Sequence, residues 1–120
     1  MGTITAQRVL DESRYTVRQI STTNLEYLID RAINFINAET GSSISNLSGS
    51  PLSVTVTGAQ EMAVKALSEL LLRAYLDKGP NVGVAGLSVT QVMADPHYKT
   101  YSKLFRMSLD RLRGRSFEKV

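Results

Sequence analysis

The side chains that most often carry catalysis are scarce in this sequence. It contains one histidine, His97, and no cysteine, so a histidine pair and a cysteine-bound zinc site are excluded. A serine–histidine–acid triad would need His97, but the sequence lacks the Gly-x-Ser-x-Gly turn that exposes a nucleophilic serine. We interpret His97 as an exposed residue of a first helical turn, and Asp30 and Glu69 as solvated charges on helix faces. The sequence therefore predicts a protein that is not an enzyme and that binds no cofactor and no metal.

A long glycine-rich segment without charge is the most distinctive part of the chain. It runs over residues 79–94, whereas helices in compact domains are usually joined by about two to eight residues. Its glycines, Gly79, Gly83 and Gly86, fit neither the dinucleotide-binding fingerprint nor the phosphate-binding P-loop. The segment is either a disordered linker or a surface for a partner. Its several valines favour the second interpretation, because a pure linker has no need of apolar side chains.

The charges are distributed unevenly along the chain. Residues 1–98 hold seven Lys and Arg against nine Asp and Glu, a net charge of −2, whereas residues 99–120 hold seven against two, a net charge of +5. This basic end is either a solvated helix face, whose cations suit the carboxyl end of the helix dipole, or a docking face for an acidic partner. Phe117 follows Arg113 and Arg115 closely in the sequence. This favours docking, because an aromatic side chain near arginines is typical of binding hot spots.

Composition and hydrophobic periodicity predict a mainly α protein. The 42% apolar content of these 120 residues suits one domain over residues 1–120, with a basic tail from about residue 113. The expected fold is a small helical domain of three to four helices with the long glycine-rich loop and two short β segments. No run approaches the ~20 apolar residues that a bilayer crossing needs, and no secretory signal is present, so a soluble protein is expected.

Capping signals place the first two helices. A short helix is expected at about residues 5–13. A second helix begins at a capping box formed by Thr23 and Glu26 and ends at Gly41, which is expected to adopt a left-handed C-cap. A loop rich in Ser and Gly follows over residues 42–51.

Two further helices are expected in the second half of the chain. The first follows a capping box of Thr57 and Gln60 and ends at about Asp77. Its inward residues are expected to be Met62, Ala63, Ala66, Leu67, Leu70, Leu71 and Ala74. The last helix begins at Asp95 and Pro96, an N-cap followed by proline at the first helical position. Its buried residues are expected to be Tyr98, Tyr101, Phe105, Leu109 and Leu112, with Lys99, Lys103, Arg106 and Arg113 along its other side.

Two segments alternate between apolar and polar residues and are predicted to be strands. They are Leu52–Thr57 and Leu87–Met93. The two strands either pair with each other inside one subunit or pair between subunits. A two-stranded sheet is only marginally stable and leaves unpaired edges, which strand addition between subunits would cover.

The order of these elements resembles that of a known protein family. The resemblance rests on the end of the second helix, Ile33-Asn34-Phe35-Ile36-Asn37-Ala38-Glu39-Thr40-Gly41, on the long helix containing Ala63–Leu67 and Ala74–Leu76, and on the Gly-Leu-Ser-Val element of the loop before a closing helix. From about Ile4 to Leu112 the chain resembles the head–tail connector proteins, also called adaptor or head-completion proteins, of long-tailed bacteriophages.

The resemblance implies a structural virion protein of the neck between head and tail, assembled in the host cytoplasm. About a dozen copies would form a homo-oligomeric ring between the portal protein and the tail-proximal completion protein. DNA would pass through the ring without sequence-specific binding, and no membrane would take part.

Two groups of residues receive roles from this interpretation. The glycine-rich loop lacks Lys and Arg, so it could face passing DNA without binding phosphates. The loop residues expected to line the channel or to contact the neighbouring subunit are Gly79, Val82, Gly83, Val84, Gly86, Leu87 and Val89. The residues expected to dock the portal are Arg106, Arg111, Arg113, Arg115 and Phe117.

Two other functions compete with this one. The first is a small helical DNA-binding protein that lays Lys99, Lys103 and Arg106 against phosphates. It lacks a short helix–turn–helix pair, because the connection before the last helix is long. The second is a helical scaffold subunit of a cellular complex.

Overall fold

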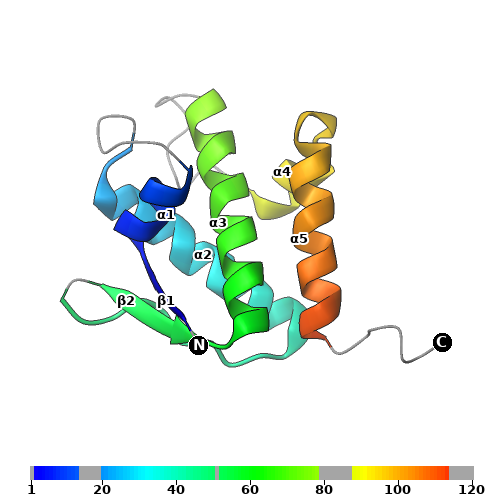
Figure 1. Cartoon of the computed structure of the whole chain (residues 1–120). Helices are drawn as coiled ribbons and strands as arrows, with labels where there is room; N and C mark the ends of the chain where they lie inside the picture. The colour runs from blue at the N-terminus through cyan, green and yellow to red at the C-terminus, as the bar shows by residue number, and fades with distance from the viewer. Residues whose placement is uncertain (1, 14–19, 51, 79–87, 114–120) are drawn as a thin grey trace.

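Five α-helices and one two-stranded sheet make up the described part of the protein (Figure 1). The structure, a computed structural model, describes residues 2–13, 20–50, 52–78 and 88–113. The elements are β1 (Gly2–Thr5), α1 (Ala6–Ser13), α2 (Thr22–Thr40), β2 (Ser53–Val56), α3 (Gly58–Lys78), α4 (Val89–Ala94), the 3₁₀ helix η2 (Pro96–Tyr98) and α5 (Lys99–Leu112). The mainly α class is confirmed, with more helices than the three to four expected.

Helix α3 is the centre of the fold. It lies beside α5, which runs in the opposite direction, while α2 crosses behind it and α1 covers its other flank (Figure 1). Its buried face carries Leu67, Leu70 and Leu71, all fully buried. This apolar face explains why the other four described α-helices all contact α3, since a helix with a wide apolar stripe needs cover on several sides.

The start of α2 differs from the expected capping box. The N-cap is Ser21, whose hydroxyl accepts a hydrogen bond from the backbone N–H of Asn24 at 3.1 Å. The prediction of a cap at Thr23 was therefore wrong by two residues. Ile20 before the cap and Leu25 in the first turn are both buried in the core, the positions of a hydrophobic staple, and their burial sets the start of the helix. The C-cap prediction is confirmed, because Gly41 has φ 72° and donates its N–H to the carbonyl of Asn37 at 2.9 Å.

The start of α3 is confirmed, but one of its inward residues is not. Gln60 donates its backbone N–H to the Thr57 hydroxyl at 3.3 Å, and its side-chain oxygen accepts from the Thr57 N–H at 3.1 Å. Met62 was expected to point inward and is instead 48% exposed. It lies at the flank of α3, beyond the arc that the neighbouring helices cover.

The sheet pairs two strands, only one of which was expected. Strand β2 lies within the predicted segment 52–57, with Val54 and Val56 buried. Its partner is β1, antiparallel to it, with Ile4 opposite Val54. The second predicted strand was wrong, because residues 89–94 form helix α4, which the Ser88 hydroxyl caps by accepting from the Gln91 N–H at 3.4 Å. The sheet therefore forms within one subunit, but with the N-terminal segment.

The polar loop after α2 is held against that helix by side chains. The Asn37 amide donates to the Ile44 carbonyl at 2.9 Å and accepts from the Ile44 N–H at 3.0 Å. Asp30 accepts from the Leu47 N–H at 2.9 Å, and Ile44 and Leu47 are buried. Two polar residues of α2 therefore satisfy loop amides that would otherwise lack partners.

An ion-pair network joins α1, α3 and β1 at the surface. The Arg8 guanidinium contacts both Glu12 and Glu61 and donates to the Thr3 carbonyl at 2.8 Å. Lys65 of α3 contacts Glu12 at 2.7 Å. Hydrogen bonds from Lys65 and Arg8 lower the pKa of the Glu12 carboxyl. The network therefore ties the N-terminal segment to the central helix.

The network gives stability a defined pH dependence. Because the folded-state pKa of Glu12 lies below its unfolded value of about 4.3, its contribution is complete above that value and is lost as the pH falls through the lower folded pKa. In urea unfolding, Glu12→Gln should be less stable than the native sequence at about pH 7, and the difference should shrink toward about pH 3. A difference that stays constant over this range would contradict the role of the Glu12 charge.

Candidate binding surface

Helix α5 is fixed in place at its N-terminal end. Asp95 caps the 3₁₀ helix η2 by accepting from the His97 N–H at 2.9 Å, with Pro96 at the first position. The sequence placed this cap at the start of the last helix, but α5 begins at Lys99, directly after η2, so that predicted start was wrong by about one turn. The buried Tyr98 donates its hydroxyl to Asp77, at the end of α3, at 2.6 Å. Further along, Phe105 is fully buried and Leu109 is buried. These contacts determine which side of α5 remains outside the core.

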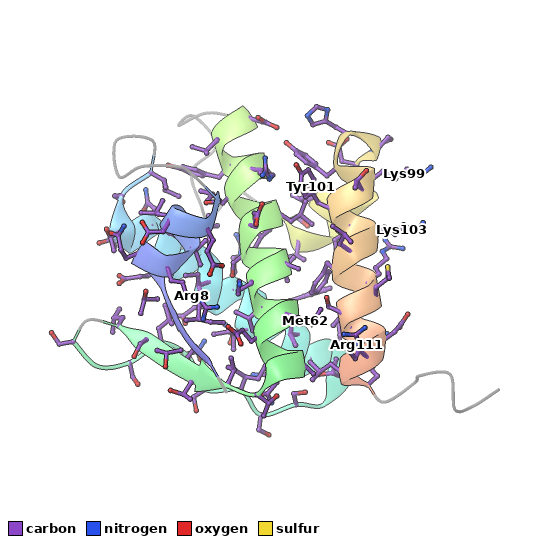
Figure 2. All side chains as sticks on the ribbon, in the orientation of Figure 1. Arg8, Met62, Lys99, Tyr101, Lys103 and Arg111 are labelled. Atoms are coloured by element: carbon purple, nitrogen blue, oxygen red, sulfur yellow. The ribbon has the colours of Figure 1, made fainter. Side chains whose placement is uncertain are left out.

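One exposed flank of α5 is basic. Lys99 and Lys103 project from the side of α5 that faces away from α3 (Figure 2), and Arg106 continues the same row. Within the described residues these three side chains make no ion pair and no hydrogen bond. They border a groove of 610 Å³ between α5 and the segment that joins α4 to η2. We call it the α4–α5 groove; its lining residues are Met93, Ala94, Asp95, Pro96, Lys99, Ser102, Lys103 and Arg106.

The other exposed flank of α5 is apolar. Leu104 and Met107 are 53% and 57% exposed, and Met62 of α3 lies beside them. We call these three residues the α3–α5 strip. Together with Lys65, Ala66, Ser108 and Arg111 they line a smaller groove of 340 Å³. The Arg111 guanidinium lies 3.6 Å from the Met62 sulfur, so the basic head covers one end of the strip (Figure 2).

The residues predicted to dock a portal are separated in the structure. Arg106 borders the α4–α5 groove, whereas Arg111 lies on the apolar flank. Arg113 was expected on the same solvated side as Lys99 and is instead turned back to α2, where it contacts the Glu39 carboxylate at 3.2 Å and the Glu39 carbonyl at 3.3 Å. That ion pair fastens the end of α5 to the end of α2. Arg115 and Phe117 lie outside the described residues.

Most of the predicted channel residues also lie outside the described part of the chain. These are Gly79, Val82, Gly83, Val84, Gly86 and Leu87. Val89 is described and begins α4, where it is partly buried against the core. This residue therefore belongs to the helical body.

His97 is exposed, as predicted, and has one notable neighbour. Its imidazole is 72% exposed and its Nε2 lies 3.5 Å from Asp77, the carboxylate that also accepts from Tyr98. This pairing was not predictable from local sequence, because Asp77 lies twenty residues before His97, across the glycine-rich segment. In the described structure the Asp77 carboxylate joins α3 to η2, and no serine hydroxyl bonds to the imidazole.

The described residues contain no group of three or more His, Asp or Glu side chains that could hold a metal ion. Among the described helices, none has the length and apolar character needed to span a membrane. No protein-family model matches the chain, and no curated protein or solved structure is significantly similar to it. The functional argument therefore depends on the surfaces of the molecule itself.

Proposed function

We propose that the protein is a structural subunit of a phage particle, a head–tail connector that assembles into a ring between portal and tail. One observation carries the proposal: three large apolar side chains, Met62, Leu104 and Met107, gather half-exposed on one face. Exposed apolar side chains that are clustered, rather than scattered singly, are typical of interaction surfaces such as protein–protein interfaces. The order of elements that resembles connector proteins supports the same function.

In this proposal the α3–α5 strip forms the contact with the neighbouring subunit. A ring needs a heterologous contact, in which one face of each copy meets a different face of the next. The strip supplies an apolar centre, and Lys65 and Arg111 supply a polar rim, as in ordinary interfaces. The basic flank of α5 is then left for the portal, and the ring encloses the passing DNA.

Two measurements test the proposal: where the protein lies in phage particles, and whether its entry into particles depends on the α3–α5 strip. Immunogold labelling of particles from phage-producing source cells should place the protein at the neck between head and tail. The variant Leu104→Asp with Met107→Asp should keep its thermal midpoint, because both side chains are half-exposed, but should no longer enter particles, which should accumulate as heads without tails.

A control variant with the same change in net charge separates the strip from a general charge effect. Ser43→Glu with Ser45→Glu places two new carboxylates on exposed positions of the loop after α2. It should enter particles normally. Absence of the native protein from purified particles would overturn the proposed function, and normal entry of the Leu104/Met107 variant would overturn the role of the strip.

A second function is favoured by a different observation, the three unpaired cations of α5. A DNA-binding protein would place Lys99, Lys103 and Arg106 on phosphates, and its affinity would fall steeply with salt. This function predicts that the affinity for duplex DNA falls about tenfold or more between 50 and 200 mM salt, as expected when several phosphates are contacted.

A further inference from the structure

The α4–α5 groove combines features that are not explained by folding alone. Its lining combines the apolar residues Met93, Ala94 and Pro96 with three cations. Its volume is 610 Å³, against 340 Å³ for the groove beside the α3–α5 strip. A hollow with an apolar floor and a few convergent polar groups is the usual form of a ligand site.

A buried hydroxyl inside this groove lacks a hydrogen-bond partner. Ser102 is 4% exposed and lines the groove, and its Oγ makes no hydrogen bond in the described structure. Buried polar atoms are nearly always hydrogen-bonded, because an unmade bond costs free energy. The Ser102 Oγ has almost no accessible surface, so a ligand in the groove can meet it only if the side chain turns toward the groove; within the described structure its hydrogen-bonding capacity is unused.

The cations form a row that matches a peptide with regularly spaced carboxylates. Lys99, Lys103 and Arg106 recur at spacings of four and three residues, so they lie on one face of α5 and span about 10 Å along its axis. Carboxylates on alternate residues of an extended peptide are about 7 Å apart, close to the ~6 Å rise between Lys99 and Lys103. The residue between two such carboxylates would point its side chain to the opposite face of the peptide.

We propose that the α4–α5 groove binds an acidic peptide segment of a partner protein, with carboxylates on Lys99, Lys103 and Arg106 and an apolar side chain on Met93 and Ala94. Turned toward the groove, the Ser102 hydroxyl would donate to a backbone carbonyl of that segment. A DNA backbone offers phosphates for the cations but no apolar group to contact Met93 and Ala94, so the groove favours a peptide. The proposal deepens the docking role proposed above, on which it rests only for the identity of the protein that supplies the segment.

The binding test uses a fluorescein-labelled peptide in which aspartates flank leucines, the same peptide with asparagine for aspartate, and a short labelled DNA duplex. Fluorescence anisotropy with the purified full chain should show the acidic peptide binding at least about tenfold more tightly than the other two probes at physiological salt. Lys103→Gln with Arg106→Gln should weaken acidic-peptide binding about tenfold, as the loss of two partly screened ion pairs predicts. The matched control Ser43→Glu with Ser45→Glu lowers the net charge equally and should bind the peptide as the native chain does.

Ser102→Ala gives a readout that a purely structural serine would not. It should weaken acidic-peptide binding severalfold while the thermal midpoint stays the same or rises, because no hydrogen bond of the folded chain is lost. A lower midpoint with unchanged binding would overturn the role of Ser102.

Three results would overturn the groove proposal: equal binding of both peptides, tighter binding of the duplex than of the acidic peptide, or no binding of any probe. None of them affects the location of the protein in phage particles. Failure of this inference and failure of the proposed function are therefore distinguishable.

Discussion

Phe105→Ala is expected to lower the free energy of unfolding by about 3–5 kcal/mol, the range found when a buried phenylalanine is truncated. Phe105 is the largest side chain among the fully buried residues, and its ring packs edge-on against that of Phe35, with centroids 6.1 Å apart. The substitution removes both the buried apolar area and this contact between α5 and α2, and it leaves a cavity beside α3. Because small domains are stable by only about 5–15 kcal/mol, the variant should be near its folding limit.

Urea unfolding followed by circular dichroism measures this loss. Leu104→Ala is the matched control, since it lies one position earlier on the same helix and is 53% exposed. It should cost less than about 1 kcal/mol, because much of its side chain already contacts water. Equal losses for the two variants would contradict the placement of α5, since one substitution tests its buried side and the other an exposed side.

Local signals predicted several elements well because those elements depend on residues near in sequence. A left-handed C-cap needs glycine, and Gly41 provides it at the end of α2. The reciprocal bonds of Thr57 and Gln60 are likewise set by a spacing of three residues. The buried side of α5 follows from its apolar period, so Phe105 and Leu109 could be placed in the core from sequence.

The errors arise where a short segment is decided by distant partners. Residues 87–93 alternate as a strand would, but the described segment 89–94 buries only Val92 and starts at a Ser88 cap, which suits a short helix packed on α3 and α5. Strand β1 has four residues, too few for a reliable pattern, and exists because β2 lies beside it in the fold. The pairing between residues some fifty positions apart is not encoded in either segment alone.

The candidate site was predictable in charge but not in geometry. Counting charges identified the basic end of the chain, yet only the fold shows that Arg113 is paired with Glu39, while Lys99, Lys103 and Arg106 have no partner among the described residues. The spacing of Ser102 from its neighbours does not reveal its unpartnered hydroxyl. The exposed Met62 was assigned to the core because periodicity predicts the direction of a side chain, but not how far neighbouring helices bury it.

Ile4→Ala tests the element that the sequence did not reveal, and it should cost about 2–4 kcal/mol of unfolding free energy. Ile4 is fully buried and lies opposite Val54 in the antiparallel pair. Its truncation should also loosen the sheet, since an isolated pair of strands depends on packing against helices. In hydrogen–deuterium exchange the amide hydrogens of β2 should then speed up at least as much as those at the centre of α2, which open through global unfolding and follow the overall loss of stability.

The neighbouring position separates packing from backbone pairing. Thr3 is exposed on the opposite face of β1, across from Thr55, so Thr3→Ala keeps the strand and should cost less than about 1 kcal/mol. Similar small losses at both positions would mean that β1 is not packed on the core in solution. The alternation of one large and one small loss is what a strand with one buried face requires, because adjacent side chains point to opposite faces. A helix continuing from α1 would instead place the sensitive positions three or four residues apart, so the two measurements discriminate between the two conformations of this segment.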